Sequence, residues 1–174
     1  VALLGPVTLT GTYVRLEPLR PAHAEGLLAA AQDESIWRWM PMNLTKREAV
    51  DGIIAEALQT EEAGTEYAFA VLDAKTSRVL GSTRYMDVTP AHKGVEIGWT
   101  WYAKDVWGSQ VNPECKLLLL RHAFEDWGAI RVMLKTDHKN ERSQQAILRL
   151  GAQFEGRLRN HRIRPDGTYR DTMM

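Results

Sequence analysis

The hydrophobic positions of the chain change their spacing several times, and each spacing predicts a type of element. Near the start, Val14 and Leu16 alternate with Arg15 and Glu17. A period of two is typical of a strand that buries one face. Residues 8–18 are therefore expected to form a strand pair or one bent strand.

Two helices are expected next. Residues 22–32 follow Pro21 and are rich in helix formers, and proline is common where a helix begins. Thr45 and Glu48 then form a capping-box pattern, in which a hydroxyl and a carboxylate satisfy the first free N–H groups of a helix. This second helix should run to about position 61.

In the middle of the chain the period changes to two, and strands are expected at 67–72 and 79–86. An apolar strand is expected next, at 95–101. The helix expected at 113–127 is apolar almost all round, so it should be buried on two sides. Gly128 supplies its stop. The remaining strand, helix and two strands are expected at 131–136, 140–150, 154–163 and 169–174.

This order of elements predicts one α/β (α+β mixed) domain over residues 1–174, with a mixed sheet and helices on both faces. The chain stops inside the last expected strand, so a truncation at that strand is left open. A length of 174 residues is enough for one domain with a sizeable core and short for two.

Composition narrows the function classes. Lys plus Arg equals Asp plus Glu at 22 each, so no excess positive charge favours nucleic acid or an anionic membrane surface. No apolar run approaches the roughly 20 residues of a membrane helix. Cys115 is the single cysteine and the five histidines lack metal-ligand spacing, so no disulfide and no metal are expected. A cytoplasmic location is the default expectation.

The segment after the third middle strand suits a phosphate. Residues 108–112 offer five successive backbone N–H groups before Pro113, with Asn112 as a candidate N-cap. The N-terminal end of a helix also carries a partial positive charge. A diphosphate would fit such a loop, although a plain strand-to-helix turn has the same local pattern.

Glu96 is a candidate general base. It lies in an apolar strand, where burial raises the pKa of a carboxylate toward the range useful for proton transfer. Two structural alternatives remain open: a salt bridge to Arg84 or Arg131, or a position that faces outward.

Asn140 and Ser143 mark the start of the helix expected at 140–150. Asn140 fits an N-cap, and Ser143 shares a helix face with Ala146 and Ile147, so it should point inward. An inward hydroxyl near the end of a sheet could donate a proton to a leaving group. His161 is a second candidate base, or a surface histidine of its strand.

Several blocks, taken in order, resemble the GNAT superfamily of acyl-coenzyme A-dependent N-acetyltransferases, and most closely its Rim-type ribosomal-protein N-terminal acetyltransferases. The resemblance covers nearly the whole chain. The blocks are Thr10–Leu19, Glu96–Trp99, Trp107–Glu114, Asp137–Ser143, Arg149–Ala152, Phe154–Gly156, Asp166–Gly167 and Arg170–Thr172.

The resemblance implies a splayed GNAT sheet and transfer of an acetyl group from acetyl-coenzyme A, with no metal, to a primary amine. The acceptor would be a peptide N-terminus or a small molecule. Glu96 would act as base, usually through water, and Ser143 would protonate the thiolate. The coenzyme would contact the splayed strand, the loop after it and the helix start, namely Thr100, Trp101, Tyr102, Trp107, Gly108, Ser109, Gln110, Val111, Asn112, Asn140 and Ser143.

The acceptor groove would be set by loops that include Trp39, Tyr85 and His161. Arginines near His161 would suit an acceptor that carries a carboxylate. The protein would act as a monomer or a homodimer, without nucleic acid or membrane as partner.

One departure from the family pattern supports an alternative function. The family loop reads Gln or Arg, two residues, Gly, one residue, then Gly or Ala, and here those three positions are Trp107, Gln110 and Asn112. If position 110 requires a positive φ, glutamine costs about 1 kcal/mol or more. The alternative is therefore a binding or regulatory domain with a degenerate coenzyme loop.

Overall fold

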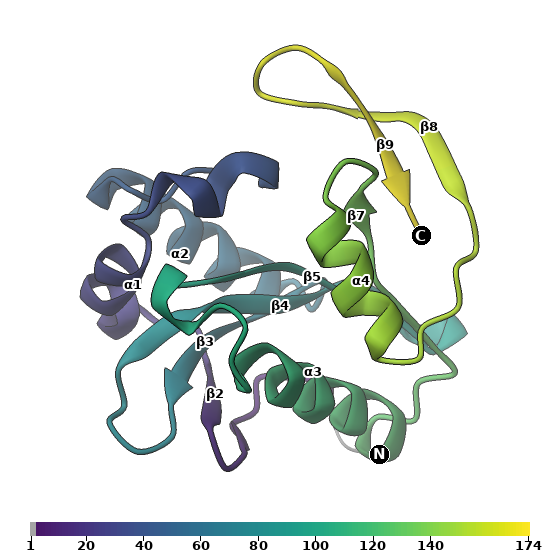
Figure 1. Cartoon of the computed structure of the whole chain (residues 1–174). Helices are drawn as coiled ribbons and strands as arrows, with labels where there is room; N and C mark the ends of the chain where they lie inside the picture. The colour runs from purple at the N-terminus through teal and green to yellow at the C-terminus, as the bar shows by residue number, and fades with distance from the viewer. Residues whose placement is uncertain (1–2) are drawn as a thin grey trace.

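A computed structural model describes residues 3–174 (Figure 1). The helices are α1 (Ala24–Ala30), α2 (Arg47–Glu62), α3 (Val111–Arg121) and α4 (Glu141–Arg149). The strands are β1 (Leu9–Thr10), β2 (Val14–Pro18), β3 (Tyr67–Asp73), β4 (Val79–Thr89), β5 (Gly94–Tyr102), β6 (Arg131–Met133), β7 (Thr136–Asp137), β8 (Arg157–Ile163) and β9 (Tyr169–Met173).

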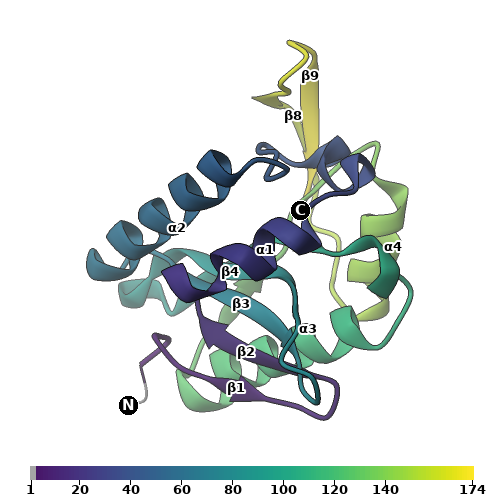
Figure 2. The same cartoon turned by 90° about the vertical axis from the view of Figure 1, so that its left-hand side faces the viewer.

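The strands form two sheets. Six pair in the order β1-β2-β3-β4-β5-β6, antiparallel except for the parallel pair β5 and β6. The other three pair in the order β7-β9-β8. Helices α1 and α2 cover one face of the larger sheet and α3 the other (Figures 1 and 2). The mixed architecture predicted from the sequence is confirmed.

Each face of the sheet has its own core. The α3 face buries Val14, Leu16, Phe69, Tyr85 and Leu119. The face under α1 and α2 buries a second set that includes Leu19, Leu27, Trp37, Ile54 and Trp101. Side chains of one strand alternate between the two sets, as a period of two requires.

Three local predictions need correction. Helix α2 begins at Arg47 rather than at Thr45, because Asn43 Oδ1 accepts from both the N–H (3.0 Å) and the hydroxyl (2.7 Å) of Thr45. Helix α3 begins at Val111, two residues before the expected start. It is also buried on one side only, since Leu117 is 54% exposed.

The end of α3 and the following strand differ as well. The chain continues past Arg121 as one π-helical turn, and Gly128 ends it with a φ of +78°. The strand expected at 131–136 is broken into β6 and β7, which belong to different sheets. This break opens the larger sheet at the position where a site was expected.

Candidate active site

The larger sheet is open along one side of β5. Pairing with β6 covers only Gly94–Glu96, opposite Arg131–Met133. Beyond Glu96, β5 keeps β4 on one side and, within the described chain, has no strand on the other. Main-chain groups of a free strand edge can pair with an extended ligand.

A bulge re-aims the side chains of this edge. Trp99 has a φ of +49°, unusual for a bulky residue, and the β4–β5 register shifts beside it. The Arg84 guanidinium lies 4.4 Å from the centre of the Trp99 ring. After the bulge, Trp101 packs on Trp37 at 5.0 Å between ring centres, on the α1 and α2 face. Thr100 faces the other way and contacts α3.

The loop after β5 turns at Gly108, whose φ is +73°. Two of the five N–H groups expected to be free have partners inside the loop: the N–H of Ser109 donates to the Val106 carbonyl and that of Val111 to the Ser109 hydroxyl, each at 3.3 Å. In the described chain the N–H groups of Gly108, Gln110 and Asn112 have no partner. Three free donors at a helix start still suit an anion.

Gln110 is not strained. Its φ of −75° is ordinary, because Gly108 already makes the turn, and Gln110 stands at the N-cap position of α3 with its side chain exposed. The strain hypothesis for this position is therefore wrong. Asn112 is not the N-cap either, and its Oδ1 accepts a hydrogen bond of 3.1 Å from the Tyr102 hydroxyl.

Two cations that the sequence pattern did not single out lie beside this loop. The Trp107 ring is held by a hydrogen bond of 3.0 Å from Nε1 to the Tyr102 carbonyl. Lys104 Nζ is 3.7 Å and Arg142 Cζ 3.4 Å from the ring centre. With the free N–H groups, these charges fit the diphosphate of a coenzyme.

Glu96 is 5% exposed, and its partner is Lys135 rather than either expected arginine. Lys135 Nζ lies 2.5 Å from Glu96 Oε2 and 3.3 Å from Asp87 Oδ2. Oε2 makes no hydrogen bond of good geometry in the described chain, so the contact is an ion pair only. Burial raises the pKa of Glu96, Lys135 opposes the rise, and Asp87 adds to it.

The two expected arginine partners are engaged elsewhere. Arg84 pairs with Glu66 at 2.6 Å, and Arg131 pairs with Glu155. Sequence spacing could not have found Lys135, because it lies between β6 and β7, where the chain leaves one sheet for the other.

The start of α4 lies on the same side of the molecule as the N-terminal end of α3, as the Arg142–Trp107 contact shows. Asn140 is the N-cap of α4, and its Oδ1 accepts from the Ser143 N–H at 3.2 Å. Ser143, Ala146 and Ile147 are all half-buried, so the inward face of α4 is only partly covered.

One of the three predicted acceptor residues does not face the surface. Tyr85 is fully buried in the α3-side core, and its hydroxyl donates to the Leu119 carbonyl at 2.5 Å, so it is removed from the acceptor surface. Trp39 is half-buried beside Arg38. His161 Nδ1 lies 2.9 Å from the Thr172 hydroxyl. Burial, and then Arg162 and Lys135, lower the pKa of His161.

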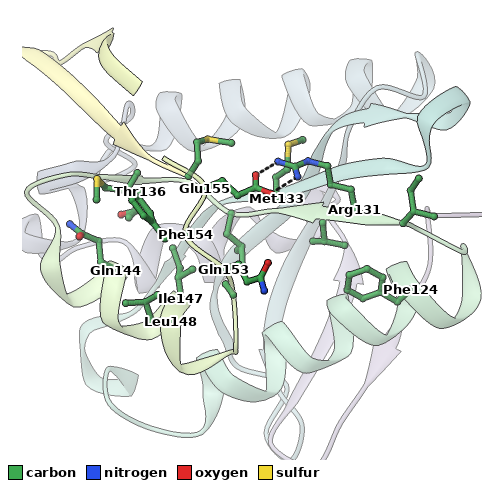
Figure 3. A pocket seen from close by; sticks show the side chains of 16 residues that line it. Phe124, Arg131, Met133, Thr136, Gln144, Ile147, Leu148, Gln153, Phe154 and Glu155 are labelled. Atoms are coloured by element: carbon green, nitrogen blue, oxygen red, sulfur yellow. Dashed lines mark hydrogen bonds and ion pairs between the residues drawn. The ribbon is translucent and has the colours of Figure 1, made fainter. Parts of the chain in front are cut away.

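A well-defined cavity lies elsewhere. It has a volume of about 550 Å³ and is lined by β6, α4, the segment 152–155 and the end of β9 (Figure 3). Its lining is largely apolar, with Phe124, Ile147 and Phe154 among the side chains, and it includes neither Glu96 nor the loop at Gly108. We place the candidate site at the open edge of β5, where the buried carboxylate and the free N–H groups lie.

Within residues 3–174, no cluster of three or more His, Cys, Asp or Glu side chains could hold a metal ion. None of the helices in this part of the chain has the length and apolar character needed to cross a bilayer.

A family model, the acetyltransferase (GNAT) domain, matches residues 14–153. The chain therefore belongs to the GNAT acetyltransferase family, whose members transfer an acetyl group from acetyl-coenzyme A. No curated protein matches the chain.

Solved structures agree with this assignment. A protein from T. thermophilus, assigned provisionally as an acetyltransferase, is 38% identical, with a TM-score of 0.84 over 97% of this chain and 87% of that one. A GCN5-related N-acetyltransferase from Brucella melitensis is 27% identical, with a TM-score of 0.88 over 96% of this chain and 76% of that one.

A ribosomal-protein-S5-alanine acetyltransferase from Vibrio fischeri is 14% identical, with a TM-score of 0.80 over 97% of this chain and 94% of that one. At this sequence identity the likeness shows a shared fold and nothing about the substrate. Ribosomal-protein acetyltransferases are thus one group among many structural neighbours. That this chain belongs to the Rim-type subgroup stays a prediction.

Proposed function

We propose that this protein is an N-acetyltransferase that moves the acetyl group of acetyl-coenzyme A to a primary amine by direct attack. The observation that carries the proposal is Glu96, a buried carboxylate with a raised pKa on the strand whose other end opens toward the loop at Gly108. A carboxylate in this state is suited to accept a proton from an ammonium group.

The coenzyme would be held along the open edge. The free N–H groups of Gly108, Gln110 and Asn112, with Lys104 and Arg142, would bind its diphosphate. Main-chain groups of β5 at Thr100, Trp101 and Tyr102 would pair with its pantetheine arm. When bound, the coenzyme supplies the acetyl group as an activated thioester.

The protein supplies the proton transfers. Glu96 accepts a proton from the acceptor amine, directly or through water, while Lys135 holds the carboxylate in place. Ser143 relays a proton to the departing sulfur: its hydroxyl gives one proton to the sulfur and takes another from water. Cys115 takes no part: it is fully buried and burial raises the pKa of its thiol, so it is inert as a nucleophile.

Cationic groups around Glu96 favour a substrate amine that carries a hydrogen-bond-accepting oxygen close to its nitrogen. Burial lowers the pKa of Arg170, whose Nε is buried without a hydrogen bond in the described chain. Both Arg170 and Lys135 act electrostatically on His161. A peptide N-terminus, whose first carbonyl lies next to the amine, meets this requirement, and so does a small amine bearing a carboxylate.

Acetyl-coenzyme A is expected to raise the thermal midpoint of the protein. A ligand at a hundred times its Kd stabilises the native state by about 2.7 kcal/mol. Differential scanning fluorimetry across a coenzyme series checks this, and a coenzyme-release assay against peptides and small amines identifies the acceptor. A midpoint that does not move at millimolar coenzyme would contradict the proposal.

Gln110→Gly is expected to change the affinity for acetyl-coenzyme A by less than about threefold, since no backbone strain is present to be relieved. Isothermal titration of both proteins measures it. A large gain in affinity for the glycine variant would instead support the binding or regulatory domain with a degenerate loop.

A further inference from the structure

A buried lysine lies beneath the open edge of β5. Lys116, in α3, is 6% exposed, and its Nζ donates to the Thr100 hydroxyl at 2.6 Å. Thr100 Oγ1 lies 2.8 Å from Thr83 Oγ1. Because Thr100 belongs to the part of β5 beyond its pairing with β6, the ammonium is one hydrogen bond away from the open edge.

No nearby anion balances this charge among the described residues. Thr100 is the hydrogen-bond partner of Lys116 Nζ there, so two of its three N–H donors are unused. Burial raises the pKa of both Cys115 and Tyr102, which keeps these neighbours neutral. The nearby Glu114 carboxylate accepts from the N–H groups of Thr12, Tyr13 and Val14.

A purely structural role does not account for such a residue. A buried cation without a counter-charge is unfavourable, and an apolar side chain of similar length would fill the same space without that penalty. Burial lowers the pKa of Lys116 to about 8, which leaves it mostly protonated at neutral pH. The site therefore holds a positive charge that could pair with a negatively charged ligand atom.

We propose that Lys116 provides the counter-charge for the sulfur end of coenzyme A. The inference rests on the proposed function, in which the thioester lies near Thr100. Breaking the carbon–sulfur bond leaves its electron pair on sulfur, and an ammonium in a dry site attracts that charge strongly. Ser143 then relays a proton from water to the sulfur, so the two residues have successive roles.

The test compares coenzyme A with desulfo-coenzyme A, which lacks the thiol. Isothermal titration gives the Kd of each between about pH 6 and pH 9, a range that spans the ionisation of a free thiol. The proteins are the wild type, Lys116→Met, and Lys46→Met as a control at an exposed position just before α2. The ultraviolet absorbance of the bound thiolate is followed in parallel.

In the wild type and in Lys46→Met, coenzyme A should bind more tightly than the desulfo compound, by up to about tenfold, which corresponds to a thiol pKa lowered by about one unit. The preference should be largest near pH 8, because Lys116 loses its own proton above that value. Lys116→Met should lose this preference and keep its affinity for desulfo-coenzyme A. Lys116→Gln provides a second neutral variant if the methionine variant fails to fold.

The outcomes separate the two proposals. If Lys116→Met keeps the wild-type preference for the thiol, or if the wild type shows none, the role of Lys116 is overturned and the acetyltransferase proposal stands. If the wild type binds neither compound, the proposed function fails, and the inference fails with it.

Discussion

Replacing Glu96 with glutamine is expected to lower turnover by about 10²- to 10⁴-fold, the usual contribution of a positioned general base. Glutamine keeps the shape of the buried side chain but cannot accept a proton. The substitution also removes a charge from a buried position, which is not costly for folding, so the variant should still fold. Steady-state kinetics with a good acceptor, together with calorimetric titration of acetyl-coenzyme A, measure both effects.

Asp87→Asn is the matched control. Asp87 also pairs with Lys135, at 3.3 Å, but it is exposed. Asp87→Asn therefore removes one negative charge from the same lysine and leaves the Glu96 carboxylate in place, although it should lower the pKa of Glu96, because Asp87 adds to its rise. We expect Asp87→Asn to change turnover by less than about threefold, as is usual for an exposed ion pair. Equal losses in the two variants would mean that the lysine network, rather than Glu96 itself, supports the reaction.

The pH profile gives an independent check on Glu96. Because burial raises its pKa, wild-type turnover should fall as the pH is lowered through that raised value, at a higher pH than an exposed glutamate would give. In Glu96→Gln this acid limb should disappear while coenzyme binding remains. An unchanged limb would assign the proton transfer to another group, of which His161 is the first candidate.

Much of this fold was predictable because its signals are local. The alternation in β2, β3 and β4 and the stop at Gly128 depend on neighbours in sequence, and the structure confirms them. The family blocks gave the positions of the loop and of Glu96. The predicted start of α2 was wrong because the Thr45 hydroxyl donates to Asn43 Oδ1 and does not cap the helix.

The contacts that give the site its charge were not predictable, because they join distant elements. Lys135 reaches Glu96 only because the chain leaves β6 for a second sheet, and Arg142 reaches Trp107 only through the packing of α4 near α3. Tyr85 looked like a groove residue, yet its strand position points into the α3-side core. Sequence spacing carries no information on which strand face meets which helix across such separations.

Lys116→Met is expected to make the protein more stable near neutral pH, by roughly 3 kcal/mol. The pKa of Lys116 falls from 10.5 to about 8 on folding, and each unit corresponds to about 1.36 kcal/mol. Below about pH 8 both states hold the proton, so the folded state bears the whole penalty. Between about 8 and 10.5 the folded state releases the proton first, and the penalty shrinks as the pH rises.

The stability gap between Lys116→Met and the wild type should therefore narrow toward pH 10.5, while the gap for the exposed control Lys46→Met stays constant. Urea unfolding at a series of pH values measures both. Thr100 keeps its contact with Thr83 in the variant, so no hydroxyl is left without a partner. A variant less stable than the wild type by the same amount at every pH would show that the ammonium is well satisfied in the native state. If the difference in unfolding free energy narrows as expected, the Lys116 charge destabilises the protein in the absence of coenzyme. A destabilising charge beside the open edge of β5 is best explained by a function, namely binding a negatively charged ligand.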